Sequence, residues 1–134
     1  MNNMSEKTAK KKTILVVEDE VFLIRSLKIR LDREDFEVKT AKNGSEAWEV
    51  MQKFPIDLAV IDIIMPERDG EWLVKKIRDD EKLAYTPIII LTNLNYGNKL
   101  DRVAAKGVYR ILTKTETSME SLVGNIKEVL RVKS

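Results

Sequence analysis

The stretch Leu58-Ala-Val-Ile-Asp62-Ile-Ile-Met-Pro-Glu-Arg-Asp-Gly70 decides the fold of this chain. Its first four residues form a continuous apolar run, which is typical of a strand buried on both faces of a parallel sheet. Asp62 follows this strand and precedes a Met-Pro turn. Open α/β sheets bind ligands in the crevice beyond the carboxyl ends of their strands, so Asp62 is a candidate functional residue. Aspartate is also common in turns, and Asp62 alone does not distinguish a site from a loop cap.

The composition is that of one globular domain, with 134 residues, 34% of them charged and 43% hydrophobic. The net charge of +2 comes from 24 basic and 22 acidic residues and gives no large field of one sign to attract nucleic acid or membranes. Cysteine and histidine are both absent, which excludes disulfides, a Ser-His-Asp triad, a histidine zinc site and phosphohistidine on this chain. No stretch approaches the roughly 20 apolar residues of a membrane span or resembles a signal peptide, so we expect a cytoplasmic protein.

Residues 1–12 are polar, with four lysines against Glu6 as the single acid. This segment offers too little apolar surface to offset the entropy of ordering, so we predict a disordered basic tail followed by one domain over residues 13–134. A nucleic-acid-binding arm is disfavoured because no aromatic residue is interleaved among the lysines for base stacking.

Apolar or alternating runs predict strands over residues 13–17, 36–41, 58–61, 87–91 and 109–113. Helical patterns follow them at about 20–33, 43–54, from 69, 99–106 and from 117. Parallel neighbours need crossover helices, and these crossovers are right-handed. The alternation therefore predicts an α/β fold with a doubly wound, five-stranded parallel sheet.

Three features of these helices are specific enough to check. Asn43 with Glu46, and Thr117 with Glu120, match the capping-box pattern at a helix start. In the helix that begins near residue 69, Arg78 is expected to point outward. The helix at 99–106 has the thinnest apolar face, and we predict that it is the most mobile.

All strands of such a sheet end on one edge, which would collect polar residues from four of them. These residues are Glu18, Asp19 and Glu20 after the first strand, Asp62 after the third, Thr92 at the end of the fourth and Lys114 after the fifth. A single acid would suit a helix amino terminus, but three acids opposite Asp62 indicate a bound cation. Carboxylates suit Mg²⁺, and an ammonium suits phosphate. Asp62 would then be the nucleophile, since a carboxylate can attack phosphorus to form an acyl phosphate.

Several motifs together are similar to the receiver domain of two-component response regulators. They are Val16-Val17-Glu18-Asp19-Glu20, the Asp-Leu-x-x-x-Asp-x-x-Met-Pro-x-x-Asp-Gly pattern from Asp57 to Gly70, Leu91-Thr92 and Thr113-Lys114. The resemblance extends from residue 13 to about 132, with the motifs in the same order and at the same intervals. It implies a flavodoxin-like (βα)5 fold with strand order 2-1-3-4-5.

The resemblance also implies roles for individual residues. Asp62 matches the phosphoacceptor, and Glu18 and Asp19 match the acidic pair that binds Mg²⁺ together with Asp62 and the main-chain carbonyl of Ile64. Thr92 matches the switch hydroxyl and Lys114 the residue that pairs with phosphate. Phosphorylation would reorder the surface formed by the fourth helix, fifth strand and fifth helix.

The expected function is that of a single-domain response regulator in a two-component system or phosphorelay. Its phosphoryl donor would be a sensor histidine kinase or a histidine phosphotransfer protein. No output domain follows residue 132, so we expect no DNA-binding domain and an effect exerted on a downstream protein target. The chain would be a phosphoacceptor with self-catalysed phosphorylation and dephosphorylation, not an enzyme, and a monomer or a weak phosphorylation-dependent dimer.

The sequence departs from the family pattern at several positions. Ile111 occupies the place of the usual aromatic switch residue, with Tyr109 two residues earlier, and Thr115 replaces a common proline. These departures leave open the alternative of a degenerate receiver that acts as a phosphorylation-independent interaction module. Ile64 and Leu94 are apolar at positions beside the expected phosphoryl group, which predicts slow hydrolysis.

Two other classes of protein fit less well. A haloacid dehalogenase-type phosphatase would need a second aspartate two residues after Asp62, where this chain has Ile64. A nucleotide-binding α/β domain would need a glycine-rich phosphate loop after the first strand, and no such motif is present.

Overall fold

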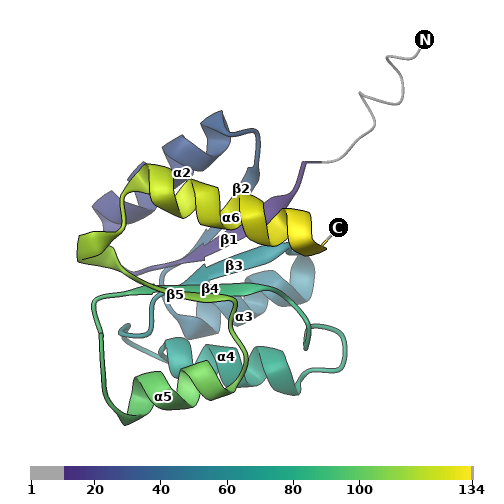
Figure 1. Ribbon diagram of the computed structural model, residues 1–134. Helices are drawn as coiled ribbons and strands as arrows, with labels where there is room; N and C mark the ends of the chain where they lie inside the picture. The colour runs from purple at the N-terminus through teal and green to yellow at the C-terminus, as the bar shows by residue number, and fades with distance from the viewer. Residues whose placement is uncertain (1–10, 134) are drawn as a thin grey trace.

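The computed structural model describes residues 11–133, in which a parallel sheet is covered by helices on both faces (Figure 1). Its strands are β1 (Thr13–Val17), β2 (Glu37–Ala41), β3 (Leu58–Ile61), β4 (Ile88–Thr92) and β5 (Arg110–Thr113). They are arranged in the order β2-β1-β3-β4-β5, and every neighbouring pair is parallel. The doubly wound α/β fold and the strand order are therefore confirmed, with strand boundaries that differ from the prediction by at most one residue.

The two most apolar runs of the sequence form the centre of the sheet. Every residue of β3 and of β4 is buried, as continuous apolar runs predict for strands covered on both faces. The expected tail over residues 1–12 lies outside the described residues except for its last two. Of these, Lys12 contacts the sheet, because its carbonyl accepts a hydrogen bond of 2.9 Å from the Glu37 amide.

The helices divide into two layers, one on each face of the sheet. α2 (Val21–Arg33) and α6 (Met119–Lys133) cover one face, and α3 (Gly44–Lys53), α4 (Gly70–Asp79) and α5 (Asn98–Ala105) cover the other (Figure 1). Successive strand residues point to opposite faces, so Leu15 and Val17 join the core under α3 and α4 while Ile14 and Val16 join the core under α2 and α6. No helix in the described part of the chain combines the length and apolarity needed to cross a membrane.

Of the two predicted capping-box signals, one agrees with the structure and the other does not. Asn43 Oδ1 accepts the Glu46 amide at the start of α3, as predicted. At α6 the predicted cap Thr117 is wrong, because Ser118 Oγ accepts the amide of Ser121. A short 3-10 turn, η1 (Lys114–Glu116), precedes Thr117 and leaves it extended, so the helix begins one residue later than the capping-box pattern indicates.

The prediction that Arg78 points outward is also wrong. Its guanidinium donates hydrogen bonds to four main-chain carbonyls, those of Ala84, Thr86, Lys106 and Gly107. Burial lowers the pKa of Arg78 below its usual value. The acceptors at the end of α5 lie 28 and 29 positions after Arg78 in the chain. Helical periodicity therefore could not show that this arginine joins the end of α4 to the end of α5.

Candidate functional site

The carboxyl edge of the sheet brings together the side chains that the sequence placed at strand ends. Glu18 and Asp19 follow β1, Asp62 follows β3, Thr92 ends β4 and Lys114 follows β5. Parallel registration explains this convergence, because Val17 is paired with Ile61 in neighbouring strands and both strands stop there.

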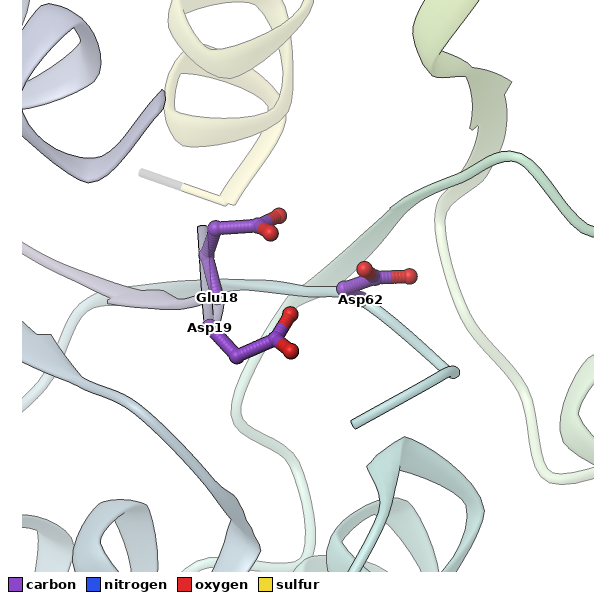
Figure 2. Close-up of side chains that lie close together, drawn as sticks. All are labelled: Glu18, Asp19 and Asp62. Carbon is purple, nitrogen blue, oxygen red and sulfur yellow. The ribbon is translucent and has the colours of Figure 1, made fainter. Parts of the chain in front are cut away.

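Three carboxylates form an acidic cluster at this edge (Figure 2). Glu18, Asp19 and Asp62 each offer an oxygen, and these oxygens all lie within 4.8 Å of one another. Glu18 and Asp62 are buried, with relative exposures of 2% and 4%, whereas Asp19 is exposed. The cluster therefore has two carboxylates of restricted access and one that faces solvent.

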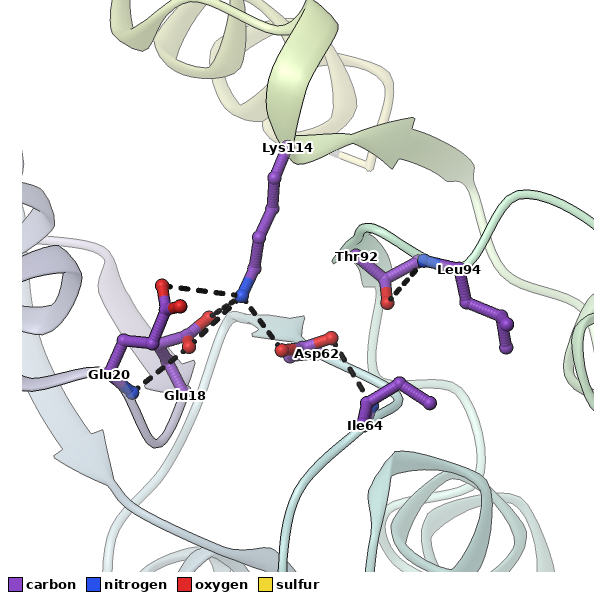
Figure 3. Close-up of polar contacts among 7 residues, drawn as sticks. All are labelled: Glu18, Glu20, Asp62, Ile64, Thr92, Leu94 and Lys114. Atoms are coloured by element: carbon purple, nitrogen blue, oxygen red, sulfur yellow. Dashed lines mark hydrogen bonds and ion pairs between the residues drawn. The ribbon is translucent and has the colours of Figure 1, made fainter.

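Lys114, which follows β5, provides the opposing charge at the same edge of the sheet (Figure 3). Its Nζ lies 2.8 Å from Asp62 Oδ2 and 2.9 Å from Glu18 Oε1. Glu20 contributes a longer ion pair of 3.8 Å and remains largely exposed. Lys114 thus pairs with two of the three carboxylates of the acidic cluster, and the third, Asp19, adds to an excess of negative charge that a cation can neutralise.

The burial of this charged group shifts two of its pKa values. Burial raises the pKa of Glu18 above its usual value, and the hydrogen bonds from Lys114 and from the Glu20 amide only partly oppose that rise. Burial alone would lower the pKa of Lys114, but its hydrogen bonds to Asp62 and Glu18 outweigh that effect and raise it. Lys114 is therefore held in its charged form beside Asp62.

Asp62 and Thr92 each accept a hydrogen bond from a main-chain amide two residues further along the chain. The Ile64 amide donates to Asp62 Oδ1 at 3.2 Å, so Asp62 is held between this amide and Lys114. Thr92 is fully buried, and its Oγ1 accepts the Leu94 amide at 3.3 Å (Figure 3). The threonine hydroxyl thus organises the first turn of its own loop.

A cleft of about 280 Å³ opens above Asp62 and Lys114. Its other lining residues are Asp19, Glu20, Ile64 and Asn93. The Ile64 side chain is 54% exposed at its rim. Leu94 does not line this cleft but packs against the hydrophobic core under α3 and α4, so the predicted pair of flanking apolar residues is reduced to Ile64.

The loop from Asp62 to α4 is held close to the site by a glycine. The Gly70 amide donates to the Ile63 carbonyl at 2.9 Å, and a Cβ at position 70 would lie 2.3 Å from the Asp62 carbonyl oxygen. Glu67 and Arg68 in the same loop adopt positive φ angles of 46° and 67°, a conformation that costs free energy in residues other than glycine. The tight path of this loop explains the need for Asp-Gly at its end.

Two of the departures noted in the sequence lie on or beside β5, and a third follows Lys114. Ile111 is 38% exposed and Tyr109 is 44% exposed on or beside β5, so neither is buried against Thr92. Thr115 lies in the turn η1, directly after Lys114.

Sequence reasoning missed two ion pairs that connect α4 to α5. Lys99 Nζ lies 2.6 Å from Asp69 Oδ2, and Arg102 pairs with both oxygens of Glu71. The partners are 30 and 31 positions apart, so no local pattern in the sequence could have indicated them.

The parallel sheet in the order β2-β1-β3-β4-β5, with an acidic cluster, a lysine and a threonine at its carboxyl edge, defines the CheY-like receiver class of fold. The chain belongs to the response regulator receiver domain family, whose model matches residues 14–127. Receiver domains of this family belong to two-component systems.

Similar sequences and a similar solved structure both support this assignment. Response regulator GtcR of Aneurinibacillus migulanus is 43% identical over 97 residues, covering 72% of this chain and 38% of the relative. The probable transcriptional regulator ycf29 of Porphyra purpurea is 36% identical over 119 residues, covering 87% of this chain and 56% of the relative. The structure of chemotaxis protein CheY4 of Vibrio cholerae matches with a TM-score of 0.82 and 28% identity, over 90% of this chain and 99% of that chain. The chain thus spans about two fifths to just over half of the two curated relatives.

Proposed function

We propose that this receiver domain accepts a phosphoryl group on Asp62 from a phosphohistidine of a partner protein. The observation that carries the proposal is the position of Asp62, which is buried in the acidic cluster and fixed 2.8 Å from the Lys114 ammonium beneath an open cleft. A histidine donor must come from another chain, because this one contains no histidine.

The transfer is a displacement at phosphorus. An Asp62 carboxylate oxygen attacks the phosphorus atom and forms an O–P bond as the P–N bond to the donor imidazole breaks. The bonding electron pair leaves with the imidazole nitrogen, which then takes up a proton. Lys114 stays charged throughout and pairs with an oxygen of the transferred group. With acetyl phosphate as donor, the leaving group is acetate. The chain's own residues therefore promote the transfer to and from Asp62, and we propose no turnover of an external substrate.

The acidic cluster fits Mg²⁺ by its chemistry and its size. An octahedral Mg²⁺ with bonds of about 2.1 Å places opposite ligands about 4 Å apart, so small rotations would bring the three carboxylate oxygens to it. Asp19 is the accessible ligand, Glu18 and Asp62 are the buried ones, and the Ile64 carbonyl is the expected main-chain ligand. When bound, Mg²⁺ would offset the negative charge of the phosphoryl oxygens during the transfer.

Thr92 is the residue that would report the reaction to the rest of the domain. Its hydroxyl oxygen accepts the Leu94 amide, and its hydrogen remains available to donate to a new phosphoryl oxygen. A movement of Thr92 toward Asp62 would change the first turn of the loop that leads to α5. Phosphorylation would in this way alter the surface of α5, β5 and α6, through which the domain would act on a protein target.

We further propose that the receiver contacts its protein target through its own surface, whatever domains accompany it. The match over 99% of the CheY4 chain supports the receiver as a folding unit of its own. Transcriptional regulation, which the name of the Porphyra purpurea relative states, belongs to that longer protein.

The test is the intact mass of the protein after incubation with acetyl phosphate, with and without MgCl₂. We expect the addition of one phosphoryl group that requires Mg²⁺ and is lost in Asp62→Asn, a variant that keeps the size of the side chain. Asp19→Asn should lower the yield at limiting Mg²⁺ and recover at high Mg²⁺. No added mass from acetyl phosphate or from a phosphorylated histidine kinase, despite normal folding, would favour the degenerate receiver instead.

A further inference from the structure

The ion pairs between α4 and α5 connect the two loops that leave the site. The loop after β3 carries Asp62 and ends at Asp69, which caps α4 by accepting the Trp72 amide. The loop after β4 follows Thr92, the last residue of that strand, and leads into α5, whose second residue is Lys99. The contact of 2.6 Å between Asp69 and Lys99 therefore joins the end of one loop to the end of the other.

A second contact repeats this link one helical turn further along α5. Arg102 donates hydrogen bonds to both carboxylate oxygens of Glu71, which lies in the first turn of α4. Figure 1 shows α5 beside α4 on the same face of the sheet. At the far end of α5, Arg78 of α4 binds the carbonyls of Lys106 and Gly107. Polar contacts from α4 thus run along the length of α5.

Apolar packing holds α5 less firmly than the other helices. Val103 is the one residue of α5 classed as buried, with Leu100 partly buried against the same core. By comparison, α4 buries Leu73, Val74 and Ile77. At its amino terminus α5 follows Gly97, which has a φ of 114°, and no side chain caps the helix there. With so little buried apolar area, contacts of modest strength can decide how often α5 leaves its place.

We propose that Lys99 and Arg102 are positioning residues for the Asp62 site. Their ion pairs with Asp69 and Glu71 hold α5 and residues 93–97 in place. In this arrangement the Thr92 hydroxyl accepts the Leu94 amide. Thr92 can move toward a phosphoryl group only if the start of its loop rearranges. The two ion pairs oppose that rearrangement, because it would separate Lys99 from Asp69. They therefore set how readily the domain switches. This consequence rests on the proposed function, but the restraint on α5 does not.

The strength expected of these contacts is small but sufficient. Ion pairs between partly exposed side chains are weak because water and salt screen them, so each changes an equilibrium by a few-fold at most. Of the two pairs, Lys99–Asp69 is the less exposed, with side-chain exposures of 38% and 25%, whereas Arg102 is 56% exposed and its pair with Glu71 is more strongly screened. We expect removal of both pairs to change the opening of α5 by roughly five- to twentyfold.

The experiment compares the double variant Lys99→Gln/Arg102→Gln with the control variant Lys75→Gln. Lys75 forms an ion pair of similar length, 2.6 Å to Asp79, but both residues belong to α4. Amide hydrogen exchange is measured on the unphosphorylated proteins at low salt and at high salt. We expect faster exchange over residues 93–105 in the double variant, with α6 unchanged and with Lys75→Gln equal to wild type. Added KCl should speed exchange in the wild type toward the double variant and have little further effect on that variant.

A charge swap distinguishes the ion pair from a purely steric contact. Arg102→Glu alone places two acids together and should increase exchange in α5, whereas Glu71→Arg/Arg102→Glu restores an opposite pair and should return exchange toward wild type. The initial rate of phosphorylation by acetyl phosphate should be higher in Arg102→Glu and return to the wild-type rate in the swap.

Unchanged exchange over residues 93–105 in the double variant would overturn the proposal. A second result would also overturn it, provided that the wild type is phosphorylated. That result is faster exchange in Arg102→Glu together with a rate of phosphorylation equal to the wild-type rate. If the wild type is not phosphorylated at all, the proposed function fails, and the exchange data still decide whether the ion pairs hold α5 and the Thr92 loop.

Discussion

Lys114 Nζ lies 2.8 Å from Asp62 Oδ2, although 52 positions separate the two residues in the chain. The side chains of both are largely removed from solvent, with exposures of 13% and 5%. A second carboxylate, that of Glu18, shares the same ammonium. The fold itself therefore brings these charged side chains together, and the Lys114 ammonium reduces the repulsion between the carboxylates of Glu18 and Asp62.

Replacing Lys114 should lower stability most when no divalent cation is present. Lys114→Gln leaves Glu18 and Asp62 close together without a counter-charge, which we expect to cost about 1–3 kcal/mol of unfolding free energy. MgCl₂ should recover part of this loss if the acidic cluster binds the ion. Urea unfolding with and without MgCl₂ measures both effects. Lys75→Gln is the control, and an equal loss in the two variants would contradict the special role of Lys114.

The stability due to Asp69 should depend on pH in a defined direction. Burial raises the pKa of Asp69, but its hydrogen bonds from Lys99 and the Trp72 amide outweigh this and leave the pKa below its usual value. The unfolded chain therefore takes up the proton first as the pH falls. An unfolded aspartate has a pKa of about 3.9, so the stabilisation is complete at pH values well above 4. It is lost as the pH falls through the lower pKa of the folded state.

Asp69→Asn isolates this charge, because asparagine can still cap α4. We expect it to lower the unfolding free energy by about 0.5–1 kcal/mol at pH 7 and by much less near pH 3. Urea unfolding at the two pH values measures the difference. In a Lys99→Gln background the same change should have little effect at pH 7. A loss that is equal at both pH values would mean that the charge of Asp69 contributes nothing.

Two glycine substitutions should change stability in opposite directions. A Cβ at position 70 would lie 2.3 Å from the Asp62 carbonyl oxygen, so Gly70→Ala must displace the main chain beside the site and should cost about 2–3 kcal/mol. Gly124 lies in α6, where a Cβ meets no atom within 4 Å, so Gly124→Ala should add about 0.5–1 kcal/mol through helix propensity. Thermal or urea unfolding compares them, and a neutral Gly70→Ala would show that the loop relaxes easily.

Ile64 should slow hydrolysis of the aspartyl phosphate. Its side chain lies at the rim of the cleft above Asp62, where an apolar group hinders an attacking water. We expect Ile64→Asn to shorten the phosphorylated lifetime severalfold, measured by intact mass after removal of acetyl phosphate. Ile29→Asn provides a control with similar exposure, 56% against 54%, on α2 and outside the cleft. A lifetime in Ile64→Asn that equals or exceeds that of wild type would argue against this role.

Much of this protein follows from local patterns in its sequence. The continuous apolar runs of β3 and β4, the helical periodicity between strands and the asparagine cap at residue 43 each act over a few residues, and the structure contains them where predicted. Because parallel strands end on one edge, the strand ends alone also predicted that Glu18, Asp62, Thr92 and Lys114 would gather there.

Only the tertiary structure decided which of these side chains touch and what surrounds them. It directed Arg78 to the carbonyls at the end of α5, moved the cap of α6 from Thr117 to Ser118, packed the partly buried Leu94 against the core and paired Asp69 with Lys99. Most of these contacts depend on how helices and loops distant in sequence pack around the sheet, and the shifted cap depends on the path of the chain after β5. Periodicity and capping patterns act within a few residues, so they determine the elements, whereas the packing of the elements determines the contacts that position the site.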